Sequence, residues 1–416
     1  MQRTHHQLTF PAFIFSTLLS VLNIAQSDPQ QHQFEITKSD GIIIATSSGD
    51  PKYTGELFSY EKVLTLNQDP SNDDSILFRP HPFPIGPDDY FYVPDEGNHR
   101  IAVFSPDGNF VRSFGRQGAG PGEFGALRLQ SNLGNIIEFF DLRHLRSSRF
   151  RTNGTLIEVL TYPSAGFHLR GVHRATDDRR IVITQHESTD EEYGWSWRRV
   201  TIIEGFADTI ATIESEHVPV GIMGQIERSG RSLSIIKMMS YVGEPVVLYR
   251  TDLSILISTG LKPELNWYNL DGKLHYVMRL VMEPVRVTRE ERQAILDAAN
   301  KRVRESSGDQ LTQALEGRRI LQIPETKPFW TDIKIDEYGY IWMKLSETES
   351  QRRTEGGPAF RLLSPSGEYL GVTRWPVLDG MISRGHLTAI ERDPETDEPF
   401  ATVYQLQIVA KGMRFP

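Results

Sequence analysis

The sequence contains no cysteine. This absence excludes disulfide bonds, zinc sites built from thiolates and cysteine nucleophiles. It also excludes a lipid-modified N-terminal cysteine. A chain of 416 residues without cross-links must therefore derive its stability from its hydrophobic core.

Basic charge and long apolar runs are also scarce. The net charge is -9, whereas a nucleic-acid-binding surface is normally basic, so we expect no nucleic-acid partner. The one long apolar run, "LTFPAFIFSTLLSVLNIA", follows Arg3 and leads to small residues at Ala25 and Ser27. This pattern predicts a secretory signal peptide at residues 1–27, with a retained membrane anchor as the alternative. We expect a periplasmic or extracellular protein without a transmembrane segment after cleavage.

A short hairpin pattern recurs four times along the chain, in "FSPDGNFV", "FRTNGTLI", "YNLDGKLH" and "LSPSGEYL". Each copy is a strand end, a tight turn and a second strand. The turns finish in Gly108, Gly154, Gly272 and Gly367. Asp-Gly and Asn-Gly supply the positive φ angles that such turns need, so each copy predicts a β-hairpin.

Six hydrophobic runs accompany these hairpins and are predicted as buried inner strands: "DDYFYVPD", "GNIIEFFD", "RRIVITQH", "EPVVLYRTD", "YGYIWMKL" and "EPFATVYQL". Six strand-rich units with little helical periodicity predict an all-β, six-bladed β-propeller over residues 28–416. The units are residues 76–124, 125–165, 166–216, 230–283, 324–376 and 377–416. The run "YEKVLTLN" at 60–67 is expected to return as the outer strand of the last blade and close the ring.

Residues 288–317 break the β pattern. Thr288 followed by Glu291 forms a capping-box sequence, and Ile295 and Val303 fall on one helical face. Gly308 is expected to end this helix before a shorter second one. The segment is therefore predicted to be a helical hairpin between the fourth and fifth blades, acting either as a plug over the channel mouth or as a lid over a ligand site.

The stretch "GRQGAGPGEF" at 115–124 is rich in glycine but is not a phosphate loop. A phosphate loop needs a helix starting directly after its glycines, and "EFGALRLQS" carries no helical pattern. The glycines instead predict a crowded connection between the outer strand of one blade and the next blade.

The residues "YVPDEGNHRIAVFSPDGNFVRSFGRQGAGPGEF" resemble an NHL repeat, whereas the other blades are degenerate. The matched positions are Asp95, Asn98, Arg100, Ile101, Asp107, Gly108, Gly115, Gly118, Gly120, Pro121, Gly122 and Phe124. The order along residues 30–416 is similar to exported bacterial six-bladed propellers of the NHL type. Within the repeat, Asp95, Asn98 and Arg100 are expected to cap a turn and pair, with ligand contact as the alternative.

Related propellers that act as enzymes, such as lactonases and amidating lyases, resemble this chain in fold and hold a metal on the central axis. The resemblance implies axial histidines or carboxylates, for calcium or zinc. The candidates at strand ends are His99, His173, His186, Asp95, Asp141, Asp252 and Asp336. No Gly-x-Ser-x-Gly, His-Glu-x-x-His or EF-hand sequence is present, so standard hydrolase and calcium-loop motifs lack support.

The stretch "STDEEYGWSWRRV" places Trp195 and Trp197 on one side of a predicted strand, next to Arg198. Paired aromatics of this kind can stack on a sugar or anchor a protein partner, and packing between blades is the alternative. The leading hypothesis is an exported binding or scaffolding module for a protein, peptide or glycan. The second hypothesis is a metal-assisted lyase or hydrolase with its site on the propeller axis.

Overall fold

The computed structural model describes residues 31–133, 136–162, 169–189, 194–205, 208–228, 231–238, 245–250, 254–319 and 321–415. The predicted signal peptide lies outside these residues. None of the helices in the described ranges combines the length and apolar character needed to cross a membrane.

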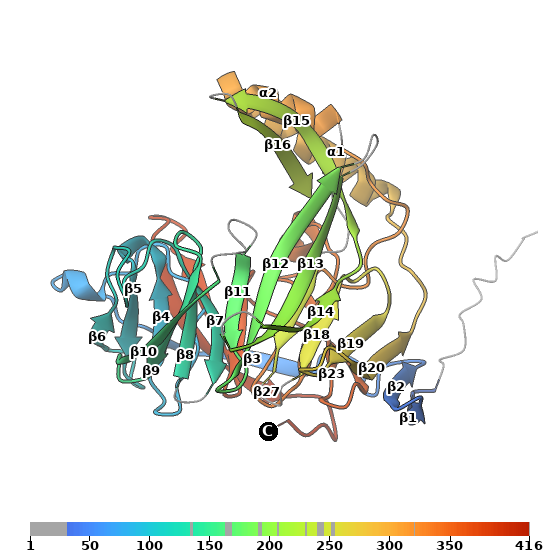
Figure 1. Cartoon of the computed structure of the whole chain (residues 1–416), viewed down its shortest axis with the longest axis horizontal. Helices are drawn as coiled ribbons and strands as arrows, with labels where there is room; N and C mark the ends of the chain where they lie inside the picture. The colour runs from blue at the N-terminus through green and yellow to red at the C-terminus, as the bar shows by residue number, and fades with distance from the viewer. Residues whose placement is uncertain are drawn as a thin grey trace, which may run out of the picture.

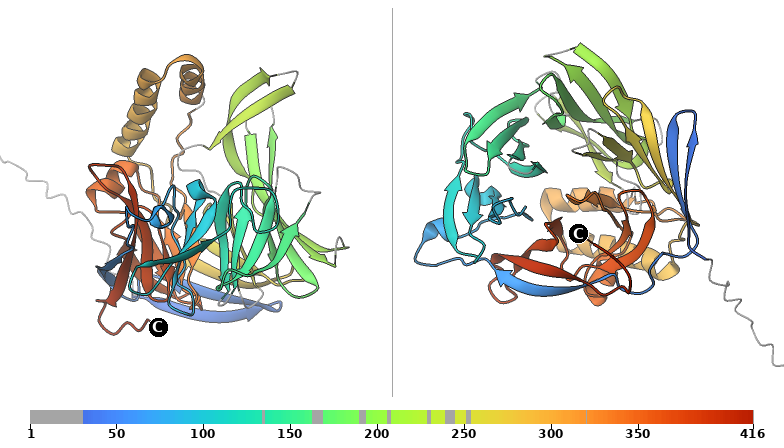
Figure 2. Two further views of the ribbon diagram at one scale, coloured as in Figure 1. Left: turned by 90° about the vertical axis from the view of Figure 1, so that its left-hand side faces the viewer. Right: turned by 90° about the horizontal axis from the view of Figure 1, so that it is seen from below.

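Six β-sheets form the blades of a β-propeller, arranged in a ring (Figures 1 and 2). Blade 1 holds β4 (Phe91–Asp95), β5 (Arg100–Phe104) and β6 (Phe110–Phe114). Blade 2 holds β7 (Leu127–Leu133), β8 (Ile136–Asp141), β9 (Arg146–Arg151) and β10 (Leu156–Thr161). Blade 3 holds β11 (Leu169–Arg174), β12 (Arg179–Thr189), β13 (Gly194–Glu204) and β14 (Asp208–Glu214).

The remaining blades follow the same meander. Blade 4 holds β17 (Val246–Tyr249), β18 (Ile255–Ser258), β19 (Glu264–Tyr268) and β20 (Leu274–Val281). Blade 5 holds β21 (Asp332–Ile335), β22 (Ile341–Lys344), β23 (Ala359–Leu363) and β24 (Tyr369–Arg374). Blade 6 holds β25 (Gly380–Ser383), β26 (His386–Arg392), β27 (Pro399–Ile408) and β3 (Phe58–Thr65). The six-bladed propeller predicted from the sequence is confirmed.

The ring is closed by two strands from opposite ends of the chain. β3 pairs antiparallel with β27, from Thr65 opposite Thr402 to Phe58 opposite Ile408. The predicted return of residues 60–67 to the last blade is therefore correct. Closure covers the outer edge of β27, which would otherwise be open to pairing with another chain.

The four predicted hairpins connect the third and fourth strands of blades 1, 2, 4 and 5. In blade 1, the irregular segment before β4 is counted as the first strand. Their turn glycines all have positive φ: Gly108 83°, Gly154 87°, Gly272 73° and Gly367 88°. At Gly367 a Cβ atom would also lie 2.7 Å from the side chain of Met278. Both backbone angle and space therefore require glycine there.

The prediction that the six hydrophobic runs are inner strands is wrong for most of them. The first strand of each sheet faces the centre of the ring, and the runs fall mainly on the second strands β8, β12 and β22 and on the third strand β27. β4 is not innermost either, because residues 80–85 bridge to it at both ends and lie between it and the centre of the ring. The run "EPVVLYRTD" is the exception, because it forms β17, the innermost strand of blade 4. Other innermost strands, such as β11 and β21, are mixed in polarity.

Two β-hairpins lie beyond the basic frame, and the sequence did not predict them. β1 (Gln33–Ser39) and β2 (Ile42–Ser48) extend blade 4, because β2 runs parallel to its outer strand β20. β15 (Val218–Arg228) and β16 (Arg231–Met238) extend blade 3 through pairing of β15 with β13. The second hairpin rises above the ring beside the helices (Figure 1).

Helices α1 (Arg289–Glu305) and α2 (Gly308–Arg319) lie between β20 and β21, and α3 (Glu349–Thr354) lies between β22 and β23. The 3-10 turn η1 (Asp73–Ser75) precedes the first blade, and η2 (Glu96–Asn98) connects β4 to β5 within it. The capping box of Thr288 and Glu291 is present at the start of α1. Gly308 is the first residue of α2 rather than the end of α1, whose C-cap is Ser306.

Candidate functional site

Asp95, Asn98 and Arg100 form one hydrogen-bonded cluster in blade 1, in which Asp95 and Arg100 are buried and Asn98 is exposed. The Asp95 carboxylate accepts hydrogen bonds from the Phe78 amide (2.7 Å), Asn98 Nδ2 (2.8 Å) and Arg100 Nε (2.9 Å). Arg100 also donates to the Ile76 carbonyl. The cluster fastens the loop before the blade to the β4–β5 connection, and this contact pattern is structural.

The rest of the NHL-like stretch also has a structural role, in turns and in the connection between two blades. Asp107 and Gly108 form the exposed turn between β5 and β6. Gly120, Pro121 and Gly122 lie in the connection from β6 to β7, where Gly122 has φ of 75° and the Gly120 amide donates to Glu123 Oε2 (2.7 Å). No helix follows these glycines. The stretch is a connection between two blades, as expected.

The candidate metal ligands do not converge. His99 is the left-handed C-cap of η2 in blade 1, His173 lies on β11 and His186 lies on β12. Asp141 caps the turn after β8, Asp336 caps the turn before β22, and Asp252 lies outside the described residues. Across the described ranges, no three or more histidine, aspartate and glutamate side chains gather in a way that could hold a metal ion.

The two tryptophans of β13 that were predicted to act as an aromatic pair have different neighbours. Trp197 is stacked between two histidine rings, with ring centroids 5.5 Å from His186 and 4.3 Å from His217. Trp195 is half-buried opposite Ser188 and Pro219. Arg198 points elsewhere and lines a large cavity. Because both faces of Trp197 are occupied, it offers a sugar ring no stacking surface in this conformation.

This cavity, which we call the α1 cavity, has a volume of about 1300 Å³ and lies between blades 3, 4 and 5 and helices α1 and α3. The innermost strand β17 supplies an apolar wall through Val246, Leu248 and Tyr249. Helix α1 also contributes Ile295 and Ala298 to the lining. Figure 2 shows the helices over one face of the ring. Pockets of 300–1,000 Å³ typically hold small molecules, so this cavity can hold several residues of a peptide or glycan.

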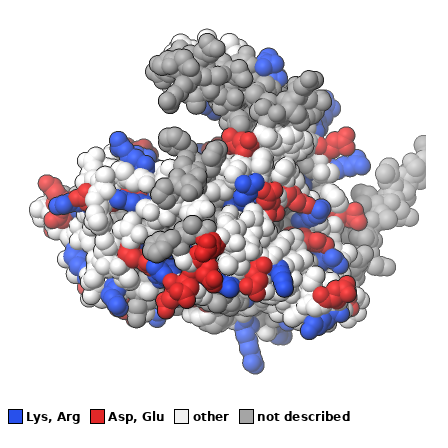
Figure 3. All heavy atoms as spheres, viewed as in Figure 1, with Lys and Arg blue, Asp and Glu red and all other residues white. Residues whose placement is uncertain are grey.

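Basic side chains predominate around the α1 cavity, although the chain as a whole is acidic. The six basic lining residues are Arg170, Arg198, Lys301, Lys344, Arg352 and Arg353, and the three acidic ones are Asp332, Glu347 and Glu349. On the outer face seen in Figure 3, in contrast, charges of both signs are interspersed. The positive surplus is therefore a local property of the cavity.

His173 is the one predicted metal ligand that lines the α1 cavity. It is buried, its Nδ1 lies 3.3 Å from Glu138 Oε2, and its ring centroid lies 5.9 Å from that of Tyr249. A buried glutamate beside a histidine can orient the ring for proton transfer. This pair is the part of the cavity best suited to acid–base chemistry.

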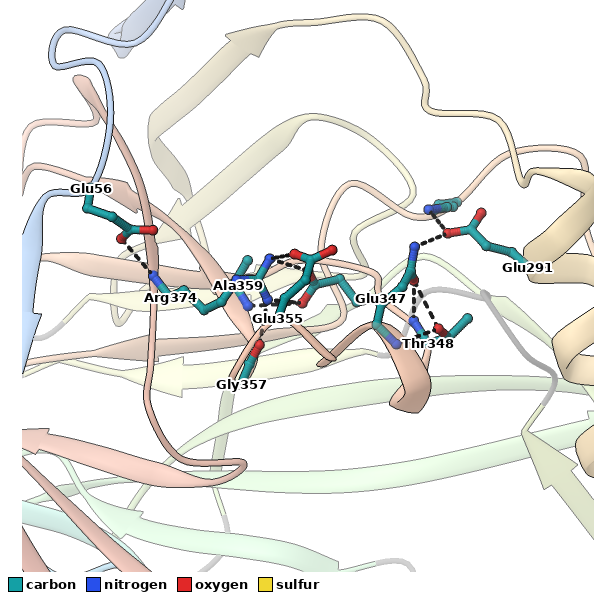
Figure 4. Close-up of polar contacts among 10 residues, drawn as sticks. Glu56, Glu291, Glu347, Thr348, Glu355, Gly357, Ala359 and Arg374 are labelled. Carbon is teal, nitrogen blue, oxygen red and sulfur yellow. Dashed lines mark hydrogen bonds and ion pairs between the residues drawn. The ribbon is translucent and has the colours of Figure 1, made fainter. Parts of the chain in front are cut away.

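One wall of the cavity, residues 346–353, is held at one end by an arginine and at the other by a capping box (Figure 4). At the blade end, Arg374 donates to Glu347 Oε1 (2.8 Å) and also binds Glu355 and the Gly357 carbonyl. At the helix end, Thr348 and Gln351 form the capping box that starts α3. The wall is consequently fixed to blade 5.

Glu291 joins this wall to α1. It is buried, caps α1 through the Thr288 amide (3.0 Å), accepts from Gln351 Nε2 (3.0 Å) and forms an ion pair with Lys327. Burial opposes its charge, but Lys327, the Thr288 amide and Gln351 outweigh that effect and lower the pKa of Glu291. α1 and α3 are thus connected through one ionised carboxylate (Figure 4).

Sequence reasoning did not identify Lys344, Arg352 or Lys301 as site residues. They lie on β22, α3 and α1, far apart in the chain, and only the fold brings them to one cavity. The one available indication was the charged residue Lys344 directly after the hydrophobic run "YIWM".

No family model and no curated protein matches the chain. Among solved structures, a Bacteroides fragilis protein described as exported is 12% identical, with 88% of this chain and 99% of that chain covered and a TM-score of 0.46. Virginiamycin B lyase from Staphylococcus aureus is 12% identical (83% and 99% covered, TM-score 0.33). A gluconolactonase from Xanthomonas campestris is 10% identical (92% and 99% covered, TM-score 0.40).

Proposed function

We propose that this protein is an exported binding module that takes a peptide or glycan segment, free or part of a larger partner, into the α1 cavity. The observation that carries the proposal is the cavity itself, about 1300 Å³ in size and walled by three blades and α1. Its apolar β17 wall and charged rim combine the two features that ligand sites need, buried contact area and orienting polar groups. α1 then acts as a lid rather than a plug.

The test is a binding screen with a variant that fills the cavity. We would measure binding of acidic, basic and neutral short peptides and oligosaccharides to residues 28–416 by calorimetry. Ala298→Trp places a large side chain in the cavity, because Ala298 lines it from α1. Gln293→Trp is the matched control, since Gln293 is exposed on α1 and does not line the cavity. The proposal predicts a ligand whose affinity falls at least tenfold in Ala298→Trp alone, and fails if both variants bind it equally.

An enzyme that uses the same cavity is the second candidate. The observation in its favour is the buried pair of His173 and Glu138 beside Tyr249 at the cavity wall. Metal content of the dialysed protein and turnover of lactone and peptidylglycine substrates test it directly. Turnover that is lost in His173→Gln would favour the enzyme over the binding module.

A further inference from the structure

Lys344 and Arg352 carry the uncompensated positive charge of the α1 cavity. The acidic lining residues are already engaged, since Glu347 binds Arg374, Glu349 binds Arg353 (2.6 Å) and Asp332 lies 3.9 Å from Lys334. For the side chains of Lys344 and Arg352, the described part of the chain contains no ion-pair partner within 4.0 Å. Both are half-buried.

The two cations are close enough to affect one another. Burial lowers the pKa of Lys344, and the neighbouring Arg352 lowers it further, whereas Asp332 opposes part of this shift. Two like charges brought together on a half-buried surface are unfavourable until an anion lies between them. β22 and the fixed start of α3 hold the pair in place, so an anion would find its donors already positioned.

We infer that the α1 cavity binds its ligand through an oxyanion, a carboxylate or phosphate group held by Lys344 Nζ and the Arg352 guanidinium. The inference rests on the proposed binding function and names the chemical group that the site recognises. Arginine suits this role because its planar fork matches the two oxygens of such a group. The apolar wall of Val246, Leu248 and Tyr249 would contact the remainder of the ligand.

The experiment uses citrate and inorganic phosphate as probes, with sodium chloride at matched ionic strength. Binding to residues 28–416 is measured by calorimetry, and the unfolding temperature is measured in parallel. We expect one or both probes to bind, and Lys344→Met and Arg352→Met each to weaken binding at least about tenfold, as for other hydrogen bonds to charged groups. Binding of citrate alone assigns a carboxylate, and binding of phosphate alone assigns a phosphate.

Lys273→Met is the matched control, because Lys273 is exposed in the turn between β19 and β20 and does not line the cavity. It should bind within about twofold of the wild type. Lys344→Met should fold, since methionine removes a charge that burial disfavours, and an unchanged unfolding temperature would verify this.

Absence of binding beyond that of chloride, or equal binding by the wild type and both cavity variants, overturns the inference. That failure is distinguishable from failure of the proposed function. A neutral ligand lost in Ala298→Trp but retained in Lys344→Met would support the binding module and reject the oxyanion.

Discussion

The charge of Lys344 makes ligand binding dependent on pH. Its pKa is lowered from the usual 10.5 by burial and by Arg352, so its proton is lost at lower pH than in an exposed lysine. We expect citrate affinity to fall as pH rises through this lowered pKa, because the deprotonated amine no longer attracts a carboxylate. The third carboxyl of citrate is already largely ionised at neutral pH, so the charge of the ligand changes little above it.

Calorimetry with citrate between about pH 7 and pH 10 measures this dependence. Lys344→Arg is the comparison, since a guanidinium stays protonated throughout and its affinity should change much less. A wild-type affinity that is constant to pH 10 would contradict the role of Lys344.

Asp95 is predicted to contribute to stability rather than to ligand binding. It is fully buried and neutralises Arg100, which is only 8% exposed. Asp95→Asn removes the negative charge, and the new amide NH2 group faces N–H groups that donate to the carboxylate in the wild type. We therefore expect the free energy of unfolding to fall by about 3 kcal/mol. Urea unfolding measures the change, and citrate affinity of the folded variant should be unaltered.

Asp107→Asn is the control for this variant, because Asp107 makes similar hydrogen bonds to Ser105 and Asn109 on an exposed turn of the same blade. Its effect on stability should be much smaller. Equal losses in the two variants would show that the buried ion pair is not the cause.

At the scale of elements, Glu291 is predicted to hold α1 to the propeller. Glu291→Gln keeps a capping side chain but loses the ion pair with Lys327, which should lower the free energy of unfolding by about 2 kcal/mol. Glu291→Ala also loses the cap, a further loss of about 1 kcal/mol. Hydrogen exchange of α1 amides should accelerate in the same order.

The pH dependence of this effect follows from the lowered pKa of Glu291. The stability it supplies is present above the ordinary glutamate pKa and is lost as pH falls through the lowered value, so wild type and Glu291→Gln should converge in acid. Glu290→Gln, on the exposed side of the same helical turn, should change stability by less than about 0.5 kcal/mol. A difference between Glu291→Gln and wild type that persists at low pH would contradict the ion-pair explanation.

The elements that could be predicted are those with a local chemical cause. Turns at Gly108 and Gly367 need positive φ, and the first turn of α1 needs Thr288 and Glu291, so short sequence patterns reveal them. Apart from β17, the innermost strands could not be identified this way, because residues such as those of β11 and β21 are mixed in polarity. Hydrophobic runs reveal burial, and in this ring the most buried strands are in the middle of each blade.

At the scale of the whole molecule, the ring could be predicted but the site could not. Repeated units imply a closed propeller, and here β3 and β27, from opposite ends of the chain, close it. The α1 cavity depends instead on how β17, β22, α1 and α3 meet in space. Lys344 and Arg352 look like ordinary surface residues in the sequence, and only their shared cavity distinguishes them.

Closure by β3 is predicted to be essential, whereas the β1–β2 hairpin is expected to be dispensable. A chain starting at residue 51 lacks only β1 and β2, which cover the outer edge of blade 4 and are largely exposed along β1. A chain starting at residue 67 also lacks β3, together with the buried Leu57, Phe58 and Leu66. It leaves β27 as an open edge and removes part of the core between blades 5 and 6.

Size-exclusion chromatography and urea unfolding distinguish the two chains. The chain from residue 51 should be monodisperse and unfold in one cooperative transition, because each of the six blades keeps its inner strands. The chain from residue 67 should aggregate or unfold at much lower urea, since an open β edge and lost core residues act together. A stable, cooperative protein without β3 would mean that packing between neighbouring blades alone holds the ring shut.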